Sequence, residues 1–170
     1  DGSADEDFIH IVGLVQYNSF EWINRIPKSI VVGIATVDRK RDFTFPTTII
    51  DDKTKYPSSG ESGKFTAFLE KELQPYIDNK YKTSKSKTII GQSLGGLLAT
   101  EILFKKPALF NNYIIISPSL WWDNGSLLSL PLPLFDNLKK NTNVYIGVGK
   151  EGLTPTAIPR VMEVDANLLA

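Results

Sequence analysis

The feature that most constrains the fold is a glycine-rich turn between a β-branched run and an apolar helical segment. Residues 87–91 (KTIIG) predict a strand, and residues 94–104 predict a helix. Between them, Gly91, Ser93 and Gly95 follow the pattern G-x-S-x-G, in which a serine stands at a sharp strand-to-helix turn. We predict that only small residues fit two positions before and two after that serine, because the turn brings two chain segments close together.

The rest of the chain alternates between the same two kinds of segment. Apolar residues recur at helical spacing over residues 7–19, 64–81 (despite Pro75) and 158–169. Buried strands are predicted for residues 29–35, 113–116 and 143–148, and a long loop for residues 36–62. Strands alternating with helices predict an α/β fold, with a three-layer, mostly parallel sheet and helices on both faces. We expect one domain over residues 1–170.

Composition excludes several classes of protein. The 170 residues contain 19 basic and 19 acidic groups and no cysteine. The lack of cysteine excludes a disulfide scaffold and a cysteine nucleophile, and with a single histidine it argues against a metal cluster. Zero net charge argues against nucleic acid or an anionic membrane as the main partner. We therefore expect no cofactor and no metal.

The start of the chain carries no targeting signal that can be interpreted. Met162 is the only methionine, so we expect the native protein to begin before Asp1. The compartment and the oligomeric state leave no signature in the sequence.

The predicted turn gives Ser93 the setting of a nucleophile. The geometry lifts the Ser93 hydroxyl above the carboxyl end of the strand. It also directs the backbone N–H of Leu94 toward the same point, as one donor for a developing oxyanion. A turn of glycine and serine without a catalytic role is the alternative interpretation.

A serine nucleophile needs a base, and the base needs an orienting acid, which follow the serine in chain order as acid and then histidine. The acid is expected just after a later strand. Glu151 comes two residues after the extended segment 143–149 and is our preferred acid. Asp165, which lies within a helical pattern, is its competitor. Asp123, in a loop after another strand, is the third candidate.

The base is not evident among these residues. His10 is the only histidine, and it precedes Ser93 within the first helical segment. We therefore expect His10 to be a helix-surface or core residue. We hypothesise that the catalytic histidine lies in native sequence beyond Ala170. The chain is then a partial domain, without its first strands and its terminal histidine segment.

Several segments together resemble the putative-esterase family of α/β-hydrolases, which includes esterase D and siderophore trilactone esterases. The similar segments are Ile30–Asp42 (IVVGIATVDRKRD), Phe68–Tyr81 (FLEKELQPYIDNKY), Ile90–Gly96 (IGQSLGG), Ser117–Asn124 (SPSLWWDN) and Val148–Glu151 (VGKE). The siderophore branch is the most similar, through SPSLWWDN and the DRKRD segment. The resemblance implies an α/β-hydrolase fold.

The resemblance also implies roles for single residues. The backbone N–H of Ser3 would be the second oxyanion donor beside Leu94. Arg39 or Arg41 would face the substrate entrance, and Trp121 would line the pocket. Glu151 matches the acidic position of the family, although some siderophore esterases manage with serine and histidine alone.

Some of these positions have other interpretations. Arg39 and Arg41 alternate with Asp38 and Asp42, so local ion pairs are an equally good expectation. Gln92 stands where family members often carry a histidine that is not the catalytic base.

The residues together predict a serine hydrolase that cleaves a small-molecule ester through an acyl-enzyme on Ser93. The resemblance suggests a siderophore trilactone, while an aryl, acetyl or carbohydrate ester fits the turn equally well. Two alternatives remain: an acyltransferase that uses the same site, and a catalytically silent binding module without the histidine.

Overall fold

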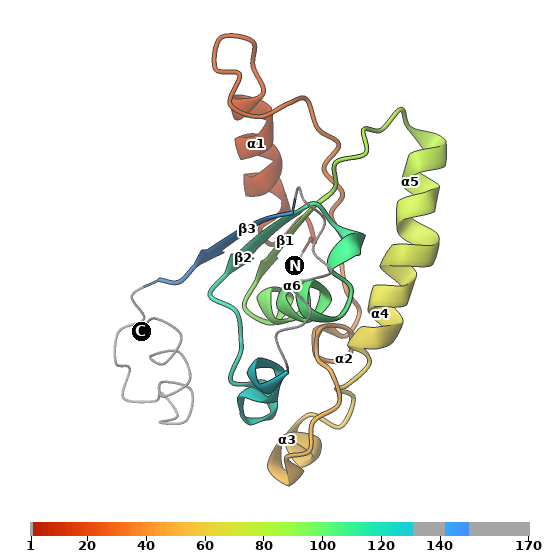
Figure 1. Cartoon of the computed structure of the whole chain (residues 1–170), viewed down its shortest axis with the longest axis vertical. Coiled ribbons are helices and arrows are strands. Elements are labelled where there is room, and N and C mark those ends of the chain that lie inside the picture. Colours follow the sequence, from red (N-terminus) through yellow and green to blue (C-terminus); the bar gives the residue numbers. More distant parts are fainter. Residues whose placement is uncertain (1, 131–141, 150–170) are drawn as a thin grey trace. The chain divides into compact units, whose positions relative to one another are not determined.

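The computed structural model describes residues 2–130 and 142–149, which divide after Arg39 into two compact units (Figure 1). The helices are α1 (Phe8–Asn18), α2 (Arg39–Phe43), α3 (Ile50–Lys55), α4 (Ser62–Phe68), the π-helical η1 (Leu69–Leu73), α5 (Gln74–Lys80), α6 (Leu94–Lys105), and the 3₁₀ segments η2 (Pro107–Leu109) and η3 (Trp122–Ser129). The strands are β1 (Thr88–Gln92), β2 (Asn112–Ile116) and β3 (Asn143–Gly147).

The first unit contains the predicted helix but not the predicted strand. Helix α1 confirms the helical stripe of residues 7–19. Residues 29–35 form no strand, although the β-branched run is present. A strand exists only through a hydrogen-bonded ladder with a neighbour. Within this unit, the N–H of Gly2 donates to the carbonyl of Ile34 (3.2 Å), and the described residues add no ladder to that single bond.

The second unit is built on a parallel three-stranded sheet in the order β1-β2-β3, which confirms the predicted α/β class. Helix α6 packs against β1 and β2, as Figure 1 shows. Tyr113 and Ile115 of β2 are buried to 1% and 0% exposure. Burial raises the pKa of the Tyr113 phenol to about 12, so the hydroxyl stays protonated and donates to the carbonyl of Pro107 (3.3 Å).

The helical pattern predicted for residues 64–81 is confirmed, and it contains a π-helical segment. The helix runs from Ser62 to Lys80 through α4, η1 and α5. Pro75 lacks an N–H, and its ring would collide with the carbonyl four residues earlier in a regular α-helix. The wider turn of η1 directly precedes Pro75 and accommodates it without ending the helix.

The segment predicted as a loop over residues 36–62 also holds two short helices, α2 and α3. Helices of 5 and 6 residues are too short to display the apolar period on which the prediction rests. The extended residues between them are anchored to η3. The indole N–H of Trp122 donates to the carbonyl of Phe45 (2.8 Å), and Trp122 itself is 1% exposed.

Asp123 completes this anchor. Its buried carboxylate accepts four hydrogen bonds: from the Thr47 hydroxyl (3.0 Å), the Thr48 N–H (2.6 Å), the Thr48 hydroxyl (2.8 Å) and the Ser126 hydroxyl (2.5 Å). Burial acts to raise the pKa of Asp123, but the hydrogen bonds from Ser126, Thr48 and Thr47 outweigh it and lower the pKa. The anion is therefore the form that holds the two segments together.

Replacing this carboxylate by an amide, in Asp123→Asn, should lower the free energy of unfolding at pH 7 by about 2 kcal/mol, because hydrogen bonds to a charged group are lost. The folded-state pKa lies below the ordinary value of 3.8. The contribution of the carboxylate is thus fully present above that value and is lost as the pH falls through the folded pKa.

Urea unfolding at pH 7 and at about pH 3 measures the free energy of unfolding of wild type and variant. The difference between the two proteins should be smaller at the lower pH. Asp51→Asn, an exposed aspartate on α3, is the matched control and should change stability by less than about 0.5 kcal/mol. If the difference in free energy of unfolding between wild type and Asp123→Asn is equal at both pH values, the role assigned to the anion is contradicted.

Candidate active site

Ser93 occupies a strained turn between β1 and α6. Its φ of 56° and ψ of −119° lie where a residue with a side chain is rarely found, at a cost of about 1–3 kcal/mol. Three backbone hydrogen bonds hold the turn. The Ser93 N–H donates to the carbonyl of Ile116 (3.1 Å), and the Ser93 carbonyl accepts from the N–H groups of Leu97 (2.9 Å) and Ser119 (3.0 Å).

The turn needs glycine at one of the two predicted positions. A Cβ on Gly91 would lie 2.2 Å from the carbonyl oxygen of Gly95, so the prediction for Gly91 is confirmed. A Cβ on Gly95 would lie 3.9 Å from the ring of Phe43, an ordinary contact, so alanine fits there, and that only small residues fit stays a prediction. Gly96 is constrained as well, since its Cβ would lie 2.9 Å from Cα of Pro118.

Leu94 is the first residue of α6, where backbone N–H groups have no acceptor within the helix. This places its N–H directly after the turn, and its role as an oxyanion donor stays a prediction. Ser3 belongs to the first unit, where its carbonyl accepts from the N–H of Glu6 (3.2 Å). The Ser3 hydroxyl hydrogen-bonds Asp5 and lowers the pKa of that carboxyl. Its predicted role as a second donor also stays a prediction.

The two arginines lie on α2. The Arg41 guanidinium donates twice to the carboxylate of Asp42, from Nε (2.8 Å) and Nη2 (3.1 Å). The local ion pair expected from the sequence is therefore present, and 39% of the Arg41 side chain is still exposed. Arg39 is the first residue of α2. That either arginine faces the substrate entrance stays a prediction.

The two adjacent tryptophans have different environments. Trp122 lies in the core with Phe45, Leu97 and Leu127, while Trp121 is half-buried at its edge. The ring centroids of Trp121 and Trp122 are 6.3 Å apart in an edge-to-face arrangement. Trp121 is thus the one of the pair with an accessible surface, and its place in a substrate pocket stays a prediction.

The candidate acids and the histidine are found in different settings. Glu151 and Asp165 lie outside these residues. Asp123 is used by the anchor to Thr47 and Thr48. His10 is exposed on α1, which agrees with the expected helix-surface position.

The described residues offer neither a metal site nor a membrane-spanning helix. No group of three or more histidine, cysteine, aspartate or glutamate side chains could hold a metal ion there. The helices of the same residues include none that is both long and apolar enough to cross a membrane.

One contact at the turn was missed by the sequence reasoning. The hydroxyl oxygens of Ser93 and Ser119 are 3.2 Å apart. Ser119 follows the carboxyl end of β2, which pairs with β1 in parallel. In a parallel sheet, residues that follow neighbouring strands meet at the same edge, so this topology was the signal that could have identified it.

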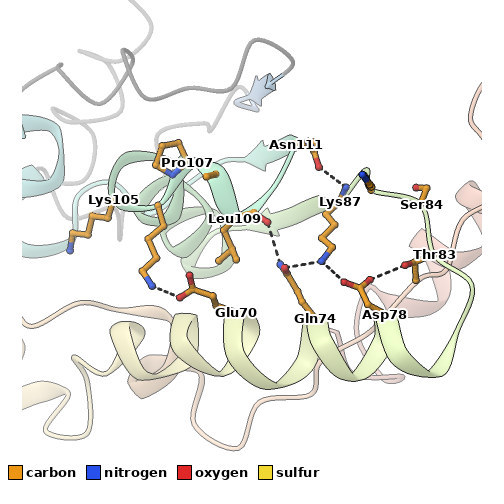
Figure 2. A pocket seen from close by; sticks show the side chains of 13 residues that line it. Glu70, Gln74, Asp78, Thr83, Ser84, Lys87, Lys105, Pro107, Leu109 and Asn111 are labelled. Atoms are coloured by element: carbon orange, nitrogen blue, oxygen red, sulfur yellow. Dashed lines mark hydrogen bonds and ion pairs between the residues drawn. The ribbon is translucent and has the colours of Figure 1, made fainter.

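A groove with a volume of about 650 Å³ lies at the other end of the same strands (Figure 2). Lys87 precedes β1 and Asn111 precedes β2, whereas Ser93 follows β1. Figure 2 shows several polar side chains of the groove joined by hydrogen bonds and ion pairs. Lys87 Nζ donates to Asp78 (2.7 Å) and to Gln74 (3.1 Å), for example. These hydrogen bonds join helix α5 to the residue before β1, at the end of the strands opposite the Ser93 turn.

A serine with positive φ between a parallel strand and a helix defines the class of the protein as α/β-hydrolase-type. The sequence pattern of the family described as "Putative esterase" matches residues 16–163. The chain belongs to this esterase family.

Three similar proteins support the assignment. Ferri-bacillibactin esterase BesA of Bacillus subtilis is 34% identical over 140 residues, which are 74% of this chain and 48% of BesA. The siderophore enterobactin esterase of Emericella nidulans is 34% identical over 91 residues, 52% of this chain and 30% of that protein. The crystal structure of an IroE-like serine hydrolase from Shewanella oneidensis is 30% identical with a TM-score of 0.82, covering 97% of this chain and 54% of that one.

The crowding at the turn predicts opposite outcomes for two glycine substitutions. Gly91→Ala should lower the free energy of unfolding by about 3 kcal/mol, because its Cβ would overlap the Gly95 carbonyl. Gly95→Ala should be neutral or slightly stabilising, since alanine is favoured over glycine by about 1 kcal/mol within helices. Urea unfolding compares the two variants. Equal losses would show that the turn does not have the close approach described above.

Proposed function

We propose that this chain carries the nucleophile of a serine esterase that cleaves small-molecule carboxylic esters. The observation that carries the proposal is the backbone of Ser93, strained at φ 56° and held by β2 and α6. Such strain is kept where the surrounding structure over-determines it, and it is concentrated at reactive sites. Family membership and the named esterases among its relatives give further support.

The proposed reaction has two half-reactions. Ser93 Oγ attacks the ester carbonyl while its proton passes to a base, and the electron pair of the carbonyl moves to the oxygen. The N–H groups of Leu94 and Ser3 stabilise this oxyanion. The oxyanion then collapses, the C–O bond breaks, and the alcohol leaves with the proton from the base. Water repeats the sequence on the acyl-enzyme and releases the acid and Ser93.

The base and acid of the proposal belong to parts of the protein that the structure does not describe. A histidine in native sequence beyond Ala170 is the proposed base. Glu151 is the preferred orienting acid, with Asp165 as its competitor. The chain spans 48% of the length of BesA and 30% of the enterobactin esterase, so a test of activity requires the full-length protein.

The relatives point to a substrate class. Two of them are named as esterases of siderophores, ferri-bacillibactin and enterobactin. We therefore propose a siderophore of the trilactone type as the ester. The exposed part of the Arg41 side chain and the half-buried Trp121 ring are the proposed contacts, because a guanidinium donates hydrogen bonds to ester oxygens and an indole offers an apolar face.

Removing the proposed nucleophile, in Ser93→Ala, should lower the rate of ester hydrolysis by at least about 10³-fold. The same variant should not react with a fluorophosphonate, which labels activated serines covalently. Ser62→Ala, which removes another buried serine hydroxyl of the same unit, is the matched control and should keep both properties. Equal labelling of wild type and Ser93→Ala would overturn the nucleophile assignment.

For the substrate, full-length protein should open a trilactone siderophore to its linear ester with a kcat/KM above that for p-nitrophenyl acetate. Arg41→Ala should raise KM for the trilactone about tenfold and leave the rate with p-nitrophenyl acetate unchanged, because only the larger ligand reaches this side chain. Lys64→Ala, an exposed cation on α4, is the control.

Product analysis decides between this proposal and other uses of the site. Linear hydrolysed product is the expected outcome. Transfer of the acyl group to an added alcohol, with little hydrolysis, would identify an acyltransferase instead. Tight binding of the trilactone without any product would identify a binding module.

A further inference from the structure

We propose that Ser119 is a positioning residue for the Ser93 nucleophile, acting through a hydrogen bond between the two hydroxyl groups. This inference rests on the proposed function. It concerns a residue outside the serine, acid, histidine and oxyanion positions to which the esterase reaction was assigned above.

Ser119 is held against the turn by two separate contacts. Its backbone N–H donates to the carbonyl of Ser93 (3.0 Å), and its hydroxyl oxygen lies 3.2 Å from that of Ser93. The side chain is buried, with 6% exposure. The neighbouring Pro118 packs so closely on Gly96 that a Cβ at Gly96 would lie 2.9 Å from the proline Cα. The segment that carries Ser119 is therefore fixed to the start of α6.

The direction of the hydrogen bond follows from the number of donors and acceptors that a hydroxyl group has. Serine has one O–H donor and two acceptor lone pairs. When Ser93 acts as nucleophile, its single O–H is donated to the base. The contact with Ser119 then requires that Ser119 donates and Ser93 Oγ accepts. One lone pair of Ser93 is occupied in this way, and the other is free to attack the carbonyl carbon.

This arrangement has two consequences for the reaction. First, it restricts rotation of the Ser93 side chain, which otherwise has three staggered positions, and so favours the geometry of attack. Second, it leaves a donor beside the oxygen that must depart when water cleaves the acyl-enzyme. At that step the bond between the acyl carbon and Ser93 Oγ breaks, the electron pair returns to Oγ, and the base supplies the proton.

The two contacts of Ser119 can be separated by mutation. Ser119→Ala removes the hydroxyl but retains the backbone N–H, so the hydrogen bond to the Ser93 carbonyl and the path of the chain are preserved. Ser62→Ala is the matched control, because Ser62 is fully buried and its hydroxyl has no hydrogen-bond partner within the described part of the chain.

The test measures kcat, KM and the second-order rate of fluorophosphonate labelling in the full-length protein. We expect Ser119→Ala to lower kcat and the labelling rate by about tenfold, with KM within about twofold of wild type. The pH at which the activity falls on the acid side should not move, because this loss of activity reports protonation of the base. Ser62→Ala should remain within about twofold of wild type in every parameter.

A labelling rate of Ser119→Ala equal to that of Ser62→Ala would overturn the inference while leaving the esterase proposal intact. Equal labelling of Ser93→Ala and wild type would overturn both. If thermal unfolding shows that Ser119→Ala does not fold, Ser119→Cys decides, since its thiol is a weaker donor of similar size. A several-fold loss of labelling then supports the inference, and the wild-type rate overturns it.

Discussion

The second unit depends on how one strained peptide segment is held in place. Ser93 adopts a conformation that costs free energy, and three backbone hydrogen bonds offset that cost by tying the segment to Ile116, Leu97 and Ser119. The absence of a side chain at Gly91 lets the strand pass within contact distance of the first turn of α6. Strand, turn and helix are therefore stabilised as one element, and the Ser93 hydroxyl is placed by the backbone.

The segment after β2 connects this turn with the loops around it. Pro118 and Ser119 lie against the start of α6, and a few residues later Trp122 and Asp123 bind the chain between α2 and α3. A single stretch of six residues, 118–123, thus contacts the Ser93 turn on one side and fixes the chain between α2 and α3 on the other. The same stretch is part of the resemblance to siderophore esterases, which gives a physical reason for its composition.

Local patterns predicted most of the fold. The elements with strong periodicity, α1, the helix that begins at α4, and α6, were found where the apolar spacing placed them. Strands β1, β2 and β3 also lie where strands were predicted, and their sheet is parallel as expected. The failures have two causes. Helices α2 and α3 are too short to show a period, and the β-branched run at residues 29–35 forms no ladder among the described residues.

The candidate site was predicted in part. A pattern of glycine and serine was enough to identify Ser93 and the need for Gly91, because both depend on the local turn. The pattern did not identify the constraint at Gly96, because the crowding there comes from Pro118, which is distant in sequence. Ser119 was missed for the same reason. Glu151 and Asp165 lie outside the described residues, so the choice between them stays a prediction.

The way the turn is held has a consequence for how such a site can change during evolution. All three bonds that fix Ser93 use its main-chain N–H and carbonyl, and none uses its side chain. These three main-chain bonds therefore do not depend on which functional group stands at this position, whereas the hydroxyl of Ser93 makes its own contact with Ser119. A new chemistry could be introduced by a single codon change at the tip of the turn, with the architecture around it inherited intact.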